Sequence, residues 1–350
     1  SNSKLVAKLP HSHEIKKVYN ISNESQNIIT QKRNEIKDIL SWISNKKILI
    51  IWPCSADYLE PLEEYADFIK TLTKKYWDKI EFIMRFYTWK PRTIWGWKWL
   101  SNSKPWDRPD ICRWLIDSRR LAIHLIEKYK ISLADEMLHP QLVNMFDDIF
   151  SYLAIWARST ENQFHREVAS WLDIPIWFKN STSWDVDIMT NSIKAWQECS
   201  SYVIAWNIYD SNWNKHSHGI LRWWKINWKN ISNYDIDTFK LLEKLFKNKQ
   251  IQNPAFLVDT NHENSNKQYE KQINIMIEVF ENIEKLKNEW IDLEKYLKWF
   301  MVESYLYDWR QDFPEDWNES KIKKWLSLTD PCIWKEKTQE FVEELYKKIT

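Results

Sequence analysis

The sequence predicts an α/β fold, a closed (β/α)8 TIM barrel. Eight short apolar runs of strand length recur along the chain, and amphipathic stretches with helical spacing separate most of them. Alternation of this kind is typical of a parallel sheet, and eight such units favour closure into a barrel. A doubly wound open sheet is the alternative, but no glycine-rich fingerprint follows the first apolar run.

The elements are expected in the following order. The strands are Lys47–Pro53, Lys79–Tyr87, Ile131–Leu138, Tyr152–Arg158, Pro175–Asn180, Tyr202–Asp210, Phe256–His262 and Trp299–Ser304. The clearest helices are Leu62–Lys75, Ile111–Tyr129, Asn162–Leu172 and Asn266–Lys287. Residues 1–46 form an N-terminal extension that is helical from Ser25 to Ser44, and a β-hairpin is inserted at about 205–225. We expect residues 47–350 to be one barrel domain.

Composition excludes several classes of protein. The 350 residues carry 50 Lys and Arg against 49 Asp and Glu, and a net charge of +1 argues against a nucleic-acid or membrane surface. No apolar run reaches the roughly 18 residues of a spanning helix, and no signal peptide opens the chain. The four cysteines, Cys54, Cys112, Cys199 and Cys332, form no CxxC pair, which fits a reducing compartment. We therefore expect a cytoplasmic protein.

Glycine and tryptophan occur in unusual numbers. Average usage predicts about 25 glycines in a chain of this length, but there are 2 glycines and 25 tryptophans. Tryptophan also stands where turns need a residue that tolerates positive φ, as in Trp-Asn-Lys at 213–215. In some lineages UGA encodes glycine, so a standard translation writes Trp for Gly. The alternative is a genuinely Trp-rich module that binds ligands by stacking.

Potential metal ligands stand at the ends of three expected strands and shortly after the last. Cys54 directly follows the first strand, the seventh strand ends at His262, Glu303 lies near the end of the eighth, and Asp330 follows soon after. Functional residues of a barrel lie at the C-terminal ends of its strands. One thiolate, one imidazole and two carboxylates meeting there suit a divalent cation of intermediate softness.

Basic residues form a second set at the strand ends. Arg85, Arg158 and Lys179 end the second, fourth and fifth strands, Lys90 and Arg92 follow the second, and Arg222 closes the hairpin insertion. A charge that ends an apolar strand inside a barrel needs a partner, and several such cations together suit phosphates and carboxylates. So many cations indicate two phosphorylated substrates.

Six motifs of the chain closely resemble those of the type I 3-deoxy-D-arabino-heptulosonate 7-phosphate (DAHP) synthases, and the resemblance runs from about Leu9 to the C-terminus. In order, they are family GPCS at 52–55, KPRTxxGWKGL at 90–100, GARTTESQxHRE at 156–167, GFKNGTDG at 177–184, ILRGG at 220–224 and MVESHL at 301–306. The chain departs from the pattern at Ser181 and Ser183. Family glycines fall on Trp52, Trp99, Trp156, Trp171, Trp177, Trp184, Trp223, Trp224, Trp309, Trp325 and Trp334. Trp97 falls on a family tryptophan, whereas Trp89 and Trp95 match neither and stay open.

The resemblance implies a metal-dependent transferase of the shikimate pathway, which makes aromatic amino acids. Its enzymes condense phosphoenolpyruvate with erythrose 4-phosphate: C3 of phosphoenolpyruvate attacks the aldehyde, water adds at C2 and phosphate leaves. The implied metal ligands are Cys54, His262, Glu303 and Asp330, with Mn, Fe, Co or Zn as the ion. The implied substrate residues are Arg85, Lys90, Arg92, Thr93, Glu136, Ala157, Arg158, Lys179 and Arg222. Lys90 is also the hypothetical proton donor, since a lysine among cations can have a lowered pKa.

The resemblance also implies partners. Family members form dimers or tetramers and bind an aromatic feedback inhibitor through the N-terminal extension and the hairpin insertion. We expect a homodimer or homotetramer, and the identity of any inhibitor stays open. The related 3-deoxy-octulosonate 8-phosphate synthases, which use a five-carbon sugar phosphate, are the alternative, although Lys90–Thr93 and Gly96–Lys98 resemble the heptulosonate enzymes.

Overall fold

The computed structural model describes residues 2–53, 55–89, 110–179, 185–199, 201–204, 207–226, 229–316 and 318–349. Eight parallel strands close into a barrel in the order β1-β12-β11-β8-β5-β4-β3-β2, which confirms the predicted fold class. The barrel strands are β1 (Lys47–Trp52), β2 (Ile80–Arg85), β3 (Ser132–Glu136), β4 (Tyr152–Ile155), β5 (Ile176–Lys179), β8 (Ser217–Leu221), β11 (Phe256–Asp259) and β12 (Leu297–Glu303).

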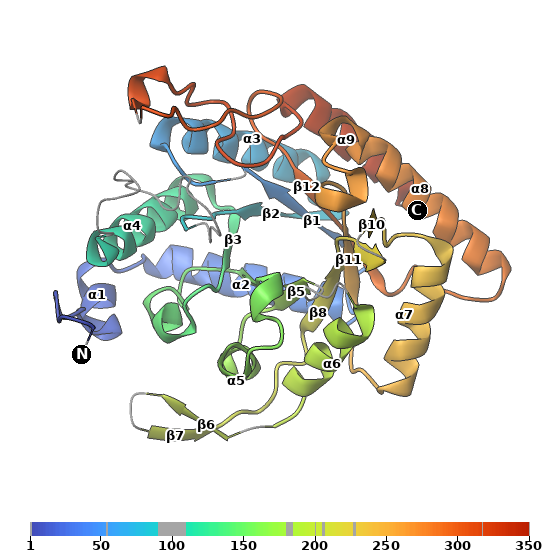
Figure 1. Cartoon of the computed structure of the whole chain (residues 1–350), viewed down its shortest axis with the longest axis horizontal. Helices are drawn as coiled ribbons and strands as arrows, with labels where there is room; N and C mark the ends of the chain where they lie inside the picture. The colour runs from blue at the N-terminus through green and yellow to red at the C-terminus, as the bar shows by residue number, and fades with distance from the viewer. Residues whose placement is uncertain are drawn as a thin grey trace.

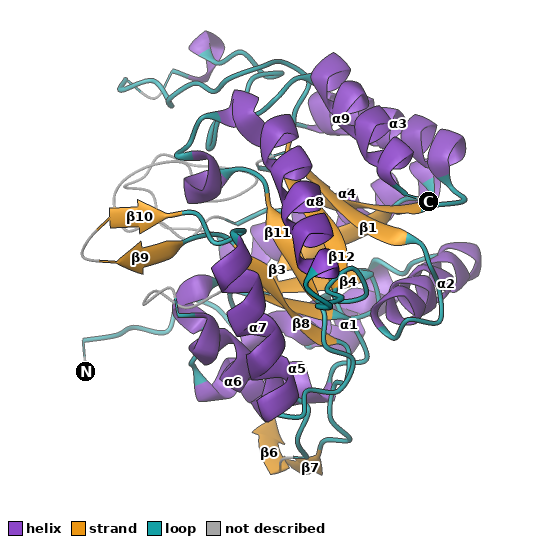
Figure 2. Ribbon diagram, turned by 90° about the vertical axis from the view of Figure 1, so that its right-hand side faces the viewer, coloured by secondary structure: helices purple, strands orange, loops and turns teal. Residues whose placement is uncertain are grey.

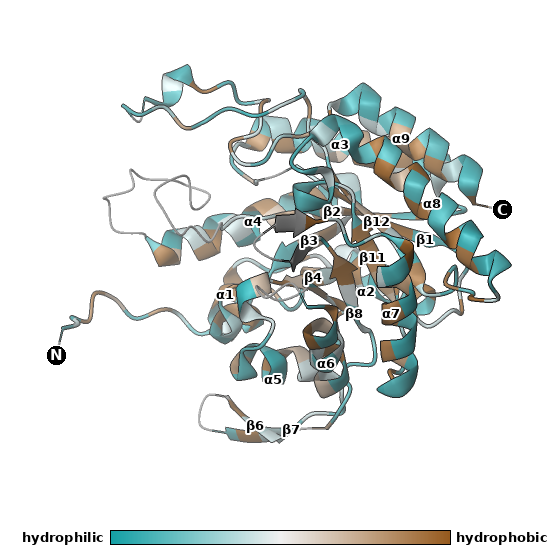
Figure 3. Cartoon of the chain, turned by 45° about the vertical axis from the view of Figure 1, so that its right-hand side comes forward, coloured by the Kyte–Doolittle hydropathy of each residue, from teal (hydrophilic) through white to brown (hydrophobic). Residues whose placement is uncertain are grey.

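Helices surround the barrel (Figure 1). They are α3 (Leu59–Tyr76), α4 (Ile111–Tyr129), α5 (Gln163–Trp171), α6 (Val186–Trp196), α7 (Ile236–Asn248), α8 (Gln272–Asn288) and α9 (Lys335–Lys348), and the β3–β4 connection carries the 3-10 turn η1 (Pro140–Met145). Each helix turns its apolar face to the strands and its polar face outward (Figure 3). None of the described helices is both long and apolar enough to cross a membrane.

The sixth barrel strand differs from the prediction. The expected strand Tyr202–Asp210 is instead a separate antiparallel pair, β6 (Ser201–Ile204) and β7 (Asn207–Asp210), and β8 takes its place in the barrel. Side chains of the pair are exposed, 61% for Val203 and 77% for Ile208. The prediction was wrong because β8 is short and begins with polar Ser217 and His218, so it lacks the apolar run that marks a buried strand.

The region expected as an insertion at about 205–225 thus contains part of β6–β7, all of β8 and the start of a second antiparallel pair. That pair is β9 (Trp224–Ile226) and β10 (Lys229–Ile231). The two pairs project from different parts of the barrel (Figure 2). As a consequence, Arg222 directly follows a barrel strand rather than closing a hairpin.

The N-terminal helices are α1 (Ser12–Val18) and α2 (Asn23–Leu40), and α2 lies across the N-terminal ends of the strands. Lys32 Nζ lies 2.7 Å from Glu81 Oε2 at the start of β2. Arg33 Nε donates to the carbonyl of Phe150, just before β4, at 2.9 Å. Because α2 covers this end, the opposite end of the barrel is the one left for a substrate.

Candidate active site

Charged residues end the barrel strands at one rim. Arg85, Glu136, Lys179, Asp259 and Glu303 are each the last residue of a strand, and Arg222 directly follows β8. All six are buried, and Arg85, Asp259 and Glu303 are 0% exposed. Burying charge is costly unless each group has a partner, and a rim of buried charges at the C-terminal ends of barrel strands indicates a functional site.

Three potential metal ligands meet at this rim. The nearest ligand atoms of His262, Glu303 and Asp330 all lie within 4.8 Å of one another. His262 Nε2 lies 3.1 Å from Glu303 Oε1. Burial and the nearby Arg222 lower the pKa of His262 to about 4, so its imidazole is neutral at pH 7 and keeps a lone pair for a metal. An imidazole and two carboxylates suit a divalent ion of intermediate softness, so these residues fit the expected metal.

Asp259 joins the metal ligands to the cations. Its Oδ2 lies 2.6 Å from His262 Nδ1 and 3.0 Å from Arg222 Nε. Burial alone would raise the pKa of Asp259, but His262 and Arg222 outweigh it and lower that pKa. A carboxylate this close to Nδ1 leaves Nε2 for a metal, a pairing common to metal-binding histidines.

Lys179, Arg85 and Arg222 form the cationic side of the site. Lys179 Nζ lies 2.5 Å from Glu136 Oε1. Burial, helped by the charges of Arg222 and Arg85, lowers the pKa of Lys179 to about 7, although the Glu136 carboxylate acts to raise it. Within the described part of the chain, Nε and Nη2 of Arg85 have no hydrogen-bond partner. Such a cluster is suited to binding an anion.

A family model described as the DAHP synthetase I family matches residues 21–343. The chain belongs to this family. It is 31% identical to the Tyr-sensitive phospho-2-dehydro-3-deoxyheptonate aldolase of Salmonella typhimurium, over 96% of this chain and 92% of that protein. It is 30% identical to the phenylalanine-inhibited aldolase of Saccharomyces cerevisiae, over 94% of this chain and 88% of that protein.

The comparison with a solved structure agrees with this family assignment. The phospho-2-dehydro-3-deoxyheptonate aldolase from Francisella tularensis SCHU S4 superposes with a TM-score of 0.87 at 27% identity, covering 99% of this chain and 98% of that one. The family likeness therefore extends from the motifs to the whole barrel.

Of the other residues expected from the DAHP synthetase I motifs, four lie outside the described chain and two follow β4. Cys54, Lys90, Arg92 and Thr93 fall outside the described residues. Ala157 and Arg158 lie on the 3-10 turn η2 (Ala157–Ser159) after β4; Ala157 is buried, whereas Arg158 is exposed, with its guanidinium 4.3 Å from the Trp156 ring centre.

Asp259 and Asn261 were missing from the residues predicted for the site. Asn261 Nδ2 donates to Glu303 Oε2 and, at 3.0 Å, to the carbonyl of Pro331, which follows Asp330. It therefore links two of the potential metal ligands. Asp259 and Asn261 belong to the run Asp259-Thr260-Asn261-His262 at one strand end, and this position was the available signal. Of the run, only His262 was recognised from the sequence as a metal ligand.

Indoles occupy the space between the cations and the metal ligands. The Trp52 ring centre lies 3.2 Å from the Arg85 guanidinium carbon and 5.8 Å from the His262 ring centre. Arg222 lies 4.8 Å from the Trp223 ring centre. A substrate that touches both Arg85 and a metal at His262 would have to lie where Trp52 now lies.

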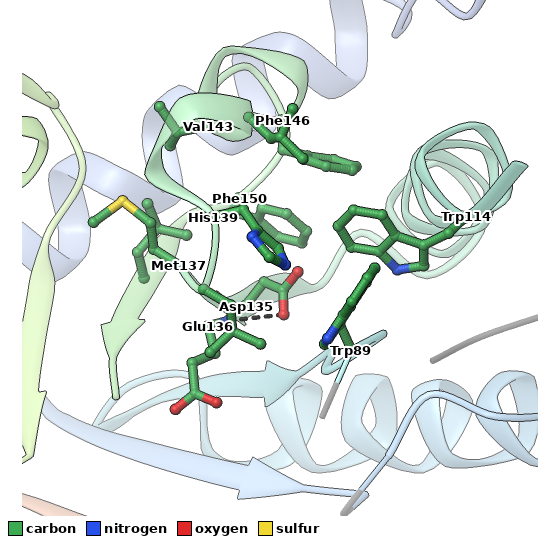
Figure 4. Close-up of a pocket in the computed structure, with 12 residues that line it drawn as sticks. Trp89, Trp114, Asp135, Glu136, Met137, His139, Val143, Phe146 and Phe150 are labelled. Atoms are coloured by element: carbon green, nitrogen blue, oxygen red, sulfur yellow. Dashed lines mark hydrogen bonds between the residues drawn. The ribbon is translucent and has the colours of Figure 1, made fainter. Parts of the chain in front are cut away.

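A small aromatic pocket lies beside the site on the other side of β3. Figure 4 shows Trp89, Trp114 and His139 grouped together, with the Glu136 carboxylate pointing away from them. The pocket has a volume of about 40 Å³, room for a few water molecules. The ring of Trp89 packs edge-on against that of Trp114, with the ring centres 4.7 Å apart.

Proposed function

We propose that this chain is a DAHP synthase, a transferase that condenses phosphoenolpyruvate with erythrose 4-phosphate and releases phosphate, the first step of the shikimate pathway. The observation that carries the proposal is the placement of buried cations and potential metal ligands on one rim of a barrel of this family. Phosphoenolpyruvate carries a phosphate and a carboxylate, and the cations suit both. The metal site beside these cations suits the second substrate, whose aldehyde oxygen a metal ion can polarise.

His262, Glu303 and Asp330 would hold the divalent metal, together with Cys54. The bound metal would supply Lewis acidity at the aldehyde oxygen. Asp259 keeps the His262 ring oriented, because it lies 2.6 Å from Nδ1. Manganese, iron, cobalt and zinc all suit this set of donors.

Arg85, Lys179 and Arg222 would hold phosphoenolpyruvate, with Glu136 fixing the Lys179 ammonium group. Arg158 would join them from the turn after β4. Lys90, Arg92 and Thr93 would meet erythrose 4-phosphate, and Lys90 would donate the proton. The last three roles rest on the motif alone.

We further propose that many of the written tryptophans are glycine in the cell. Among the described residues, Trp42, Trp213, Trp290, Trp299 and Trp309 have positive φ, a conformation that favours glycine. The ring centres of Phe178 and Trp196 lie 2.7 Å apart, well inside the distance of about 4.5–7 Å at which aromatic rings pack. Glycine at position 52 would clear the space between Arg85 and His262.

Two synthetic genes test the function, one as written and one with glycine at the family-glycine and positive-φ positions. Phosphate release is measured with phosphoenolpyruvate, a sugar phosphate and Mn²⁺, with chelator as control. We expect the glycine form to turn over at about 1 per second or faster with erythrose 4-phosphate, and the written form to be inactive. No release from either form contradicts the proposed function, and preference for a five-carbon sugar phosphate would favour the octulosonate alternative.

We also propose a homodimer or homotetramer with an aromatic amino acid as inhibitor. Exposed Ile208 and Tyr209 on β6–β7, and Leu5 and Val6 near the N-terminus, offer apolar contacts for a second copy. Curated relatives are named as Tyr-sensitive or phenylalanine-inhibited. Light scattering with and without Phe, Tyr or Trp tests both ideas, and a monomer unaffected by all three contradicts them. A cytoplasmic location is supported by the free thiols of Cys112 and Cys199.

A further inference from the structure

Gln272, the first residue of α8, is fully buried behind the metal ligands. Its Oε1 accepts a hydrogen bond from the backbone N–H of Glu303 at 2.9 Å. Its Nε2 donates to the backbone carbonyl of Glu303, also at 2.9 Å. One side-chain amide therefore pairs with both backbone polar groups of a potential metal ligand.

Gln272 takes the place that a strand would otherwise fill. The pairing of β11 with β12 ends at Asp259 and Met301, after which the chain turns toward His262. Glu303 lies two residues beyond Met301, so on this side it has lost its neighbouring strand. A buried backbone N–H or carbonyl needs a partner. Gln272 Oε1 pairs with the Glu303 N–H, and Gln272 Nε2 shares the Glu303 carbonyl with the N–H of Ile333, which lies 3.1 Å away.

The same amide is tied to the segment that carries His262. The Thr260 hydroxyl donates to Gln272 Oε1 at 3.0 Å and also lies 3.0 Å from the Met301 carbonyl. Thr260 is fully buried and stands two residues before His262. Gln272 therefore links the strand end that bears Glu303 to the segment that bears His262.

We propose that Gln272 is a positioning residue that fixes the Glu303 backbone so that its carboxylate meets His262 and Asp330 at the metal. The inference rests on the proposed function, because it assigns a metal to these ligands. Gln272 itself would not touch the metal. Residues that orient metal ligands typically change metal affinity about 10–100-fold when they are replaced.

Gln197 offers a matched control. It is 3% exposed and makes the same kind of pair: its Nε2 donates to the Gln252 carbonyl at 2.6 Å, and its Oε1 accepts from the Gln252 N–H at 2.8 Å. It follows α6, and Gln252 precedes β11, so this pair lies at the rim away from the metal ligands. Losing it removes the same two bonds to a backbone N–H and carbonyl without touching the site.

The experiment compares Gln272→Met with Gln197→Met in the glycine form of the protein. Metal-free protein is titrated with Co²⁺ alone by calorimetry, and thermal unfolding is recorded without metal. We expect Gln272→Met to weaken Co²⁺ binding about 10–100-fold, and Gln197→Met to leave it unchanged while lowering the unfolding temperature. Equal Co²⁺ affinity in Gln272→Met and the parent, or equal weakening in both variants, overturns the inference.

A parent protein that binds no Co²⁺ would instead overturn the metal site of the proposed function, and the inference with it. Should Gln272→Met fail to fold, Thr260→Val decides the question, because it keeps the shape of the side chain and removes only the hydroxyl that holds Gln272 Oε1. We expect a smaller loss of Co²⁺ affinity in the same direction. Unchanged affinity in a folded Thr260→Val protein would then count against the role of Gln272.

Discussion

Lys179 sets how the anion site responds to pH. Its pKa lies near 7 because the ammonium group is buried beside Arg222 and Arg85. The ammonium form therefore predominates below pH 7 and the neutral amine above it. Phosphoenolpyruvate is an anion and needs the charged form, so kcat/KM of the glycine form for phosphoenolpyruvate should fall as pH rises through 7, by up to about tenfold per unit.

Lys179→Arg separates this effect from other titrations, because arginine stays charged throughout the range. We expect the variant to be slower than the parent at pH 6, since a guanidinium cannot keep the contact with Glu136 in the same geometry. Its kcat/KM should be nearly flat from pH 7 to 9. If the variant loses activity with pH as steeply as the parent, another group controls the profile.

The sequence identifies residues of the site by type and position, and misses those that act through hydrogen bonds. His262 and Glu303 could be proposed because an imidazole and a carboxylate at strand ends are chemically conspicuous. Gln272 could not, because a glutamine that starts a helix is ordinary until the missing strand beside Glu303 is seen. Asp259 also stands at a strand end, but its role depends on a distance of 2.6 Å between its Oδ2 and His262 Nδ1, which the sequence does not reveal.

Helix ends show where tryptophan is the wrong residue. After α8, the N–H of Trp290 bonds to the Lys287 carbonyl and that of Ile291 to the Leu286 carbonyl, with φ 65° at Trp290. This C-terminal motif normally places glycine at that position. Trp290 is 97% exposed, so it adds no core packing in return.

Trp290→Gly should therefore stabilise the protein. Relief of a left-handed conformation is worth about 1–2 kcal/mol, which we expect as a rise in the free energy of unfolding in urea. Trp77→Gly is the control, since Trp77 follows α3 and is 65% exposed, but has an ordinary φ of −58°. There glycine should lower stability by about 0.5–1 kcal/mol. A loss in both variants would argue against glycine at 290.

Most elements could be predicted from apolar runs and helical spacing, as the exact match of α4 to Ile111–Tyr129 illustrates. Prediction failed at β8, where Ser217 and His218 are buried inside the barrel. Tyr152 contacts His218 through a hydroxyl–imidazole hydrogen bond, which explains how a polar side chain is accommodated there. Periodicity cannot reveal such a pair, because the partners are far apart in sequence.

At the scale of the whole molecule, the written tryptophans conflict with the site that the barrel forms. The fold brings Arg85, Lys179, Arg222 and the metal ligands to one rim, yet Trp52 fills the space between Arg85 and His262. A substrate could contact both Arg85 and a metal at His262 only if the indole at position 52 were absent. With the indole present, the substrate would have to lie elsewhere. The family match over residues 21–343 favours an absent indole.

Protein made with its native genetic code should therefore have an intact mass well below 42.9 kDa. Peptide sequencing should find glycine at 52, 156, 177, 223 and 224, and tryptophan at 89, where the ring packs against Trp114. Glycine at these positions and tryptophan at 89 would indicate recoding, because random sequence errors would not put glycine at the positions where the backbone or the site requires it. A mass equal to that of the written chain would mean that the indoles are real. The indoles would then fill the substrate site of the barrel, and the proposed activity would have to be withdrawn.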